Sequence, residues 1–521
     1  MKVNPILLEV FKNKLSSVSE EMGVSLNRTA FSPNIKERRD FSCAVFDKNG
    51  DIIAQAAHIP VHLGSMPLSV KEAIKNFEFE KGDMVVLNDP FKGGTHLPDI
   101  TIVAPIFAEG VREPVFFAGN RAHHSDVGGM SAGSMPLSTN IFQEGIIIPP
   151  LKLMEKGKLD KKLMNFFLNN VRTPYEREGD FSAQIMANIT GIKRTEELIE
   201  KYGLDMVNFY SKSLIEYSEK IMSKTIENIP DGKYEFEDYL DDDGTGREDI
   251  KINVSITIKG SKAVIDFSKS DDRVEGSVNA VYAITLSCVL YVFRSLVKEN
   301  IPTNAGCLRP IELITQKGSV VDASFPAAVA GGNVETSQRI VDVILGALSK
   351  ALPDIIPAAS QGTMNNIAIG GIDKKTGNPF TYYETLAGGM GASSGGNGES
   401  AVHSHMTNTL NTPIEALEYS YPFIIREYSI RKASGGKGKF CGGNGLTREL
   451  QLTSDAEVTV LSERRKGAPY GLKGGDNGGK GKNIIIMNGK TFKMPSKFNT
   501  KLHEGDILRI ETPGGGGYGK K

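Results

Sequence analysis

The residues best suited to chemistry in this chain are histidines that lie close to aspartates. The 521 residues include only eight histidines, and five of them fall in one stretch: His58, His62, His96, His123 and His124. A lone histidine usually occupies an ordinary core or surface position, so the clustering is the signal rather than any single residue. Imidazole is a common metal ligand and a common acid or base near neutral pH. This stretch is therefore the first candidate for a functional site.

A His-x-x-Asp spacing occurs twice within that stretch. In LNDPFKGGTHLPDI, His96 and Asp99 follow a short apolar run; in NRAHHSDVGG, His123 and Asp126 follow another. The proline and the two glycines of the first segment exclude a regular helix, which predicts a loop at the end of a strand. A loop can direct both side chains at one ion, and imidazole with carboxylate suits zinc, manganese or iron(II).

Two alternatives stay open for these loops at this point. The histidines and aspartates could only brace their loops by hydrogen bonding, and the pattern favours a metal site slightly over that interpretation. Either His123 or His124 could be the ligand, with the other acting as a base or holding the loop. If the preceding apolar runs are neighbouring strands, both loops leave one edge of a sheet. They would then form a site with an open coordination position, able to activate water or polarise a carbonyl.

Composition excludes several classes of protein. The 61 basic and 62 acidic residues give a net charge of −1, which disfavours a nucleic-acid binder. No apolar run reaches the ~18–20 residues that a membrane span needs, and the charged N-terminus predicts a helix rather than a signal peptide. Four cysteines lie far apart without a CxxC pair, which favours a cytoplasmic protein with free thiols. No GxxxxGK[ST] motif is present, so no phosphate-binding loop for ATP is predicted in this chain.

The hydrophobic patterns predict an α+β fold, a large mixed multi-layer structure with central sheets. Helical spacing covers 1–30, 68–77, much of 151–228, 279–298 and 336–351, and a hairpin is expected around Asn49-Gly50. Glycine is abundant, with 56 residues, and 20 of them fall between 431 and 521 among short β runs. The closing TPGGGGYGKK is either disordered or a close-packed turn. We expect four regions: a metal-site α/β region (1–150), a helical segment (151–230), a mixed α/β region (231–420) and a glycine-rich antiparallel β region (421–521).

Blocks spread along the chain carry a resemblance to a known family. They read, in order, DFSCAVFD, HIPVHLGSMP, LNDPFKGGTHLPDITIVAPIF, RAHHSDVGGMSAGSMP, EGIIIPP, AVAGGNVETSQRI, SHMTNTLNTPIE, SERRKGAPYGLKGG and TPGGGGYG. In this order they resemble the hydantoinase B family. Its relatives are the B-type component of N-methylhydantoinase, the C-terminal part of 5-oxoprolinase, caprolactamase, and one subunit of acetone and acetophenone carboxylases. The resemblance runs from near residue 20 to residue 519.

The resemblance implies a division of labour between two subunits. ATP is bound by a separate hydantoinase A-like subunit, which phosphorylates the amide or carbonyl oxygen, and the B-type subunit completes the reaction at a divalent metal. Carried onto this chain, the metal ligands are His96, Asp99 and one of the pair His123/His124. We favour His123 because it restores the His-x-x-Asp pattern.

The resemblance also implies an acid or base beside the metal, and three residues are candidates: Asp126, Glu144 and His124. Glu144 serves equally well as a structural residue. His58 and His62 are expected to support the metal histidines, and His403 and His405, with Asn408, are weaker candidates for that role.

Two stretches outside the clusters complete the candidates. The polar segment 32–40 could contact substrate, although covering a sheet edge is favoured, and His503 is expected at the surface.

Three functions follow from the resemblance. The leading one is a metal-dependent subunit of an ATP-dependent hydrolase of small cyclic amides, working in a hetero-oligomer with its ATP-binding partner. The first alternative is a subunit of an acetone- or acetophenone-type carboxylase, which the same ligands would serve. The second alternative is a structural subunit without a catalytic site, which the two His-x-x-Asp loops disfavour.

Overall fold

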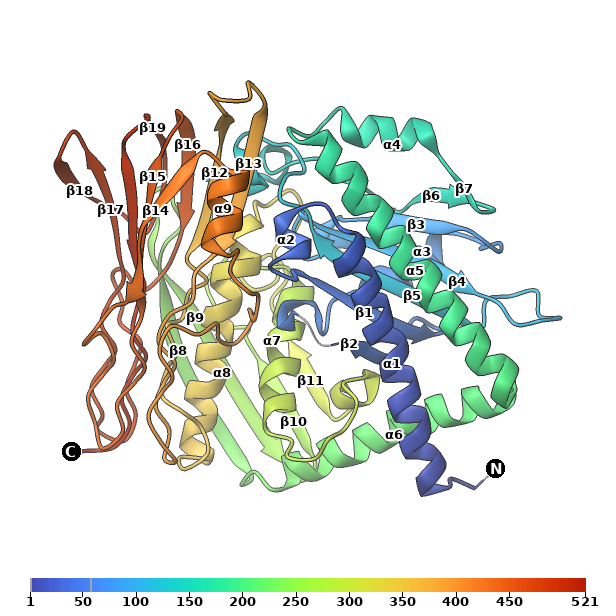
Figure 1. Ribbon diagram of the computed structural model, residues 1–521. Helices are drawn as coiled ribbons and strands as arrows, with labels where there is room; N and C mark the ends of the chain where they lie inside the picture. Colours follow the sequence, from blue (N-terminus) through green and yellow to red (C-terminus); the bar gives the residue numbers. More distant parts are fainter. Residues whose placement is uncertain (1, 57–58) are drawn as a thin grey trace.

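The structure is a computed structural model that describes residues 2–56 and 59–521 (Figure 1). Within these residues the strands form four sheets, with long helices packed against them, which confirms the predicted α+β class. None of the described helices combines the length and the apolar character that a bilayer crossing requires. The predicted division into four regions stays a prediction.

A seven-stranded sheet positions the histidine-rich stretch. Its strand order is β2-β1-β5-β4-β3-β6-β7. The strands are β1 (Phe41–Asp47), β2 (Ile52–Ala56), β3 (Met84–Leu87), β4 (Asp99–Ile106), β5 (Phe116–His123), β6 (Leu151–Glu155) and β7 (Lys158–Leu159). β1 and β2 form the hairpin predicted around Asn49-Gly50.

The two His-x-x-Asp loops follow β3 and β5, which are separated by β4 rather than adjacent. Because both strands pair antiparallel with β4, they run in the same direction, and their loops leave the same end of the sheet. The convergence that the sequence hypothesis required is therefore present, although the strands themselves are not neighbours.

Helices bury both faces of this sheet. On one face lie α1 (Pro5–Thr29), α5 (Pro174–Tyr202) and α6 (Leu204–Glu227), and α3 (Met66–Asn76) covers the other. In β1, Cys43 and Val45 face α1, while Ala44 and Phe46 face α3. Burial on both faces explains why these strands read as continuous apolar runs.

α1 shows how the sequence sets one of these helices. Pro5 occupies its first position, and the side chain of Asn4 accepts hydrogen bonds from the backbone N–H groups of Ile6 and Leu7. The helix packs closely on α5, because a Cβ atom at Gly191 would lie 2.5 Å from the Met22 sulfur. A side chain at that position would have to displace the side chain of Met22.

Three further sheets complete the described part of the chain. The first contains β8 (Gly232–Asp242), β9 (Glu248–Lys259), β10 (Lys262–Asp266) and β11 (Ile311–Ile314). The second contains β12 (Asn366–Ile372), β13 (Pro379–Thr385), β16 (Ala456–Leu461) and β19 (Lys497–Leu502). The third contains β14 (Phe423–Ile430), β15 (Leu446–Leu452), β17 (Lys482–Met487), β18 (Lys490–Met494) and β20 (Ile507–Glu511).

The remaining helices link these layers. They are α2 (Pro33–Lys36), α4 (Lys161–Leu168), α7 (Tyr282–Ser295), α8 (Ser337–Ala351) and α9 (Ile414–Ser420). α8 is preceded directly by a five-residue π-helical turn, Gly332–Thr336. The helices predicted over 279–298 and 336–351 correspond to α7 and α8.

The glycine-rich C-terminal tail is close-packed. Gly515 donates a hydrogen bond to the Gly443 carbonyl at 2.9 Å and accepts one from the N–H of Gly436 at 2.8 Å. A Cβ atom at Gly515 would lie 2.1 Å from the Met390 carbonyl oxygen. Extended backbones approach so closely here that side chains do not fit, which selects the packed alternative over disorder.

Candidate metal centre

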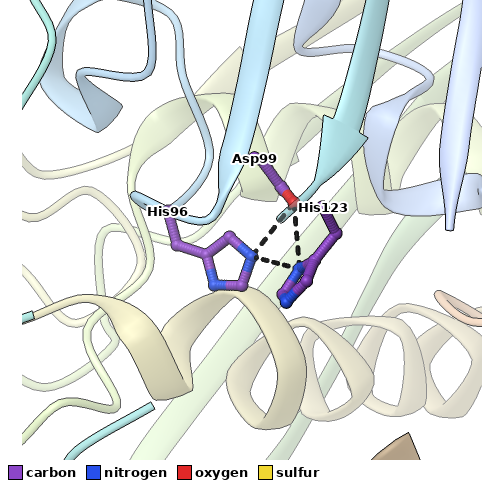
Figure 2. A group of neighbouring side chains, drawn as sticks. All are labelled: His96, Asp99 and His123. Atoms are coloured by element: carbon purple, nitrogen blue, oxygen red, sulfur yellow. Dashed lines mark hydrogen bonds and ion pairs between the residues drawn. The ribbon is translucent and has the colours of Figure 1, made fainter. Parts of the chain in front are cut away.

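Three buried side chains meet at the end of the seven-stranded sheet: His96, Asp99 and His123 (Figure 2). His96 Nε2 lies 3.1 Å from Asp99 Oδ1 and 3.2 Å from His123 Nδ1. His123 Nδ1 lies 3.2 Å from the same carboxylate oxygen. The three atoms therefore form a nearly equilateral triangle.

The backbone explains why these side chains converge. Asp99 is the first residue of β4 and His123 the last of β5, and they are directly opposed in the antiparallel register. Opposed side chains project to the same face of a sheet. His96 reaches them through a turn in which the Asp99 N–H donates to the His96 carbonyl at 3.1 Å. The Asn88 amide fixes that turn by donating to the Leu97 carbonyl at 2.8 Å.

The triangle fits a divalent cation better than it fits a hydrogen-bonded cluster. Four ligands around zinc at their usual bond lengths form a tetrahedron with edges of ~3.3 Å, close to the observed 3.1–3.2 Å. Without a cation, Asp99 Oδ1 can only accept, so few protons are available for three close contacts. The cluster could therefore hold a metal ion, whose identity the residues leave open.

The charge states of the cluster suit metal binding. Burial alone would raise the pKa of the Asp99 carboxyl, but His96, His62 and His123 more than reverse this, and its pKa lies well below the ordinary value. Burial lowers the pKa of His123, against the opposing effects of Asp99 and Asp40. An ionised carboxylate beside a neutral imidazole is the form in which these side chains bind metals.

Two residues hold the second oxygen of the Asp99 carboxylate. Thr95 Oγ1 donates to Asp99 Oδ2 at 2.5 Å, and His62 Nε2 lies 3.3 Å from the same atom. His62 is held in turn by Ser42 Oγ, 3.0 Å from its Nδ1. His62 thus contacts the carboxylate of the cluster, and His58 lies outside the described residues.

The segment 32–40 lies beside the cluster. Asn34 Nδ2 donates to the His123 carbonyl at 2.6 Å, and the His123 N–H donates to the Asp40 carbonyl at 3.0 Å. Arg38 is fully buried and donates to the carbonyl of Tyr383 at 3.0 Å. This segment therefore borders the cluster, which its sequence alone did not favour.

Tyr383 forms one wall of the cluster, and sequence reasoning missed it. Its ring stacks on His123 with centroids 4.6 Å apart and planes inclined by 13°. Its hydroxyl donates to Asn366 Oδ1 at 2.8 Å, and Asn366 Nδ2 donates to Glu335 Oε1 at 2.6 Å. Because Tyr383 lies in a plain strand far along the chain, no local pattern marked it.

His124 and Asp126 turn away from the other three residues. His124 Nε2 lies 2.9 Å from Gln184 Oε1 on α5, and burial lowers its pKa to about 4. Asp126 accepts from the Arg172 guanidinium at 2.8 Å and from the Arg172 N–H at 2.7 Å. The structure thus brings His123, but neither of these neighbours, into the cluster.

Glu144 is buried on a neighbouring loop. Its Oε1 accepts hydrogen bonds from Ser138 Oγ at 2.7 Å and from the N–H groups of Val329 at 2.8 Å and Ala330 at 3.0 Å. Its Oε2 has no hydrogen-bond partner among the described residues. Burial raises the pKa of this carboxyl to about 7, although those hydrogen bonds and the charge of His96 act to lower it. A carboxyl with this pKa can both give and take a proton near neutral pH.

The other histidines lie at separate places. His405 Nε2 is 3.6 Å from Asp342 Oδ1, and burial lowers its pKa. Burial and the charge of Arg38 lower the pKa of His403 to about 4. Asn408 is exposed, and His503 is exposed as predicted. The supporting role of His403, His405 and Asn408 for the metal stays a prediction.

Fold and cluster together define a protein whose buried His/Asp triad could bind a metal. The chain belongs to the hydantoinase B/oxoprolinase family, whose model matches residues 4–521. Among curated relatives, it is 41% identical to a 5-oxoprolinase of Dictyostelium discoideum over 100% of this chain. It is 31% identical to a putative B-type component of a D-/L-hydantoinase from a Pseudomonas strain, covering 99% of this chain and 90% of that one. The chain spans only 41% of the 5-oxoprolinase, but 90% of the hydantoinase component.

Two solved structures share the fold. The ATP-dependent caprolactamase of Pseudomonas jessenii superposes with a TM-score of 0.93 at 27% identity, covering 100% of this chain and 92% of that chain. An acetone carboxylase superposes with a TM-score of 0.91 at 18% identity, covering 99% and 76%. At that identity the second likeness shows the fold alone.

Proposed function

We propose that this chain is the metal-dependent subunit of an ATP-dependent enzyme that opens a cyclic amide such as a lactam, a hydantoin or 5-oxoproline. The observation that carries the proposal is the triangle of His96, Asp99 and His123. The distances between its three atoms match those between ligand atoms around a coordinated cation. The names of the 5-oxoprolinase, hydantoinase and caprolactamase relatives support the reaction class.

The proposed ligands are these three residues. Asp40 acts on the pKa of His123, and His62 contacts the carboxylate of Asp99. A divalent cation held there would polarise a carbonyl oxygen and lower the pKa of a bound water. Glu144 is the proposed acid/base, because it has a free carboxylate oxygen and a pKa of about 7. It would take the proton of the attacking water and return it to the departing ring nitrogen.

Asp126 and His124 act, in this proposal, as positioning residues. Asp126 ties the loop after β5 to Arg172, and His124 ties the end of β5 to α5 through Gln184. Both contacts hold in place the backbone that follows His123.

The proposal includes a separate ATP-binding partner of the hydantoinase A type. The sequence has no phosphate-binding loop, and the 5-oxoprolinase relatives are more than twice as long as this chain. We therefore expect substrate activation to take place on another polypeptide in a hetero-oligomer.

Metal analysis of the purified chain tests the site. We expect near-stoichiometric zinc, manganese or iron in the wild type, and loss of most of it in His96→Ala and in His123→Ala. The fold should survive, because loop and strand-end ligands contribute little to the core. A wild type that stays metal-free after incubation with each of these ions would refute the site.

The reaction is tested by mixing the chain with its hydantoinase A-type partner, ATP and a panel of lactams, hydantoins and 5-oxoproline. We expect ring opening that needs both subunits and that fails with His96→Ala. Parallel reactions with acetone and bicarbonate measure carboxylation. Carboxylation without ring opening would replace the proposed reaction by the alternative one.

A further inference from the structure

Asn333 contacts the cluster from a distant part of the chain. It lies in the π-helical turn before α8, and its Nδ2 is 3.1 Å from His96 Nε2, 237 positions away in the chain. Its side chain is buried, with 4% of its surface exposed, and its Oδ1 has no hydrogen-bond partner among the described residues. A buried carboxamide oxygen without a partner costs free energy unless something else occupies the site.

The contact between Asn333 and His96 is incompatible with metal binding. An amide Nδ2 can only donate, so the contact requires the lone pair of His96 Nε2. That lone pair is the one a cation would use, because Nε2 is the atom that faces Asp99 and His123. A bound cation therefore takes away the acceptor of the Asn333 N–H. The Oδ1 atom of Asn333 already has no hydrogen-bond partner among the described residues. The amide must then find another partner inside a closed, polar site.

The backbone that carries Asn333 is firmly held. Ser337 Oγ donates to the Asn333 carbonyl at 2.7 Å, and a Cβ atom at the preceding Gly332 would lie 1.9 Å from the Asn279 carbonyl oxygen. The segment just before it is held by Glu144 through the N–H groups of residues 329 and 330. Because the backbone is held, Asn333 can change its hydrogen-bond partner only by rotating its side chain. π-helical turns of this kind are frequent at functional sites.

We propose that Asn333 is a substrate-binding residue whose amide N–H donates to a substrate oxygen next to the metal, either the amide oxygen or an oxygen of the carboxylate product. The proposal rests on the proposed function, since it needs a cation at His96. A donor held beside a developing oxyanion contributes most when it is buried and preorganised. Asn333 meets both conditions: it contacts the proposed ligand His96, and Glu144, the proposed acid/base, binds the backbone just before it.

Three variants separate the possible roles of the side chain. Asn333→Ala removes the amide, and Asn333→Asp keeps an oxygen but replaces the donor by an acceptor. Gln338→Ala is the matched control, because Gln338 is a buried carboxamide on α8 that also has an unpaired oxygen and donates to the Ser404 carbonyl. It therefore reports on the general cost of removing an amide from this helix.

The first measurement uses cobalt(II)-loaded protein, whose visible absorption reports on the metal environment, titrated with acetate as a carboxylate probe. We expect both Asn333 variants to bind acetate at least about tenfold more weakly, which corresponds to the loss of one hydrogen bond to a charged group. Cobalt stoichiometry should stay within twofold of wild type, and Gln338→Ala should match wild type. Unchanged acetate affinity in Asn333→Ala, or loss of the metal from it, would overturn the proposal.

The second measurement is ring opening with the partner subunit. We expect kcat/KM to fall by about 10²–10³-fold in Asn333→Ala, as for the loss of an oxyanion donor, and by at least as much in Asn333→Asp. Full activity in Asn333→Ala would refute the inference while leaving the proposed function intact. A wild type that binds no cobalt would instead refute the proposed function.

Discussion

The two His-x-x-Asp segments have the same spacing and each follows a strand of the same sheet, yet their aspartate side chains point to different places. Both residues of His96-Leu-Pro-Asp99 point into the cluster, where their side chains are 3.1 Å apart. In His123-His-Ser-Asp126 only the first histidine does so, and the aspartate pairs with Arg172 at 2.8 Å. Spacing alone therefore does not decide where two side chains point.

The backbone and the charge environment account for the difference. The first segment makes a tight turn, sealed by the hydrogen bond from the Asp99 N–H to the His96 carbonyl, which folds the two side chains together. The second begins at the last residue of β5, so its aspartate lies in the chain that leaves the strand. Three imidazoles lower the pKa of Asp99, whereas burial raises that of Asp126 despite Arg172. A buried carboxylate among several imidazoles indicates a metal site, and one matched with a guanidinium indicates a structural pair.

The largest contrast should come from removing each aspartate charge. Asp99→Asn should weaken metal binding by more than the ~10–100-fold that the loss of a supporting residue costs, because it removes a ligand. Asp126→Asn should leave metal affinity within twofold of wild type. Competition with a chromophoric chelator measures both affinities. Equal losses in the two variants would mean that the second aspartate also serves the metal.

Glu144 should supply the proton transfer that neither Asp126 nor His124 is placed to perform. Glu144→Gln preserves the acceptor of the three hydrogen bonds at Oε1 but cannot ionise, and we expect activity to fall by about 10²–10⁴-fold. The wild-type profile of kcat/KM against pH should show an inflection near pH 7, where Glu144 titrates, and the variant should lack it. Asp126→Asn should keep the inflection. If the inflection near pH 7 persisted in Glu144→Gln, another group would be responsible for it.

Arg172 should matter for folding rather than for the metal. Arg172→Met leaves the Asp126 carboxylate buried without its cation and should reduce the free energy of unfolding by about 1–3 kcal/mol at pH 7. The guanidinium opposes the burial that raises the pKa of Asp126, so removing it raises that pKa further. The folded chain then binds this proton more tightly than the unfolded chain, and the loss grows as pH rises above ~4.

Denaturant titrations of Arg172→Met at pH 4.5 and pH 7 measure this effect. The double variant Arg172→Met/Asp126→Asn is the control, because it removes both charges and should recover most of the stability at pH 7. If the single variant loses as much stability at pH 4.5 as at pH 7, the pairing with Asp126 is not the cause.

The sequence predicted the α+β class and the convergence of the two His-x-x-Asp loops at one end of a sheet, and the structure shows why it could predict no more. The α+β class follows from the strong periodicity of the helices and strands, and the convergence of the two loops follows from the antiparallel order β3-β4-β5. The choice of His123 over His124 is consistent with strand geometry, because consecutive residues at the end of β5 point to opposite faces. Local patterns were sufficient for these features.

Other parts of the site depend on contacts between distant positions. Asp126 meets Arg172 46 positions later, and His96 meets Asn333 237 positions later. Tyr383 stacks on His123 from β13, a strand of a different sheet that lies far along the chain. No window of sequence contains both partners of such contacts. Only the folded chain therefore reveals which carboxylate pairs with a guanidinium and which amide reaches the His/Asp cluster.

The smallest effect should come from His124, and it should appear only in acid. Burial lowers the pKa of this imidazole from 6.5 to about 4, so the folded chain holds it neutral while the unfolded chain begins to protonate it near pH 6.5. Its contribution to stability is therefore complete above pH 6.5 and is lost as pH falls towards 4. His124→Gln can retain a hydrogen bond to Gln184 but has no proton to gain. It should consequently lose less stability than wild type between pH 6.5 and pH 4.5, with metal content unchanged at pH 7.5.

Denaturation midpoints at several pH values measure this dependence of stability on pH. His503→Gln is the control for the removal of an exposed histidine, since His503 lies at the surface, where it pairs with Asp455. A slope in His124→Gln equal to that of wild type would show that His124 does not stay neutral in the fold. The protonation states of His123 and His124 would then differ less than their environments predict. The assignment of His123 alone to the cluster would then rest on strand geometry only.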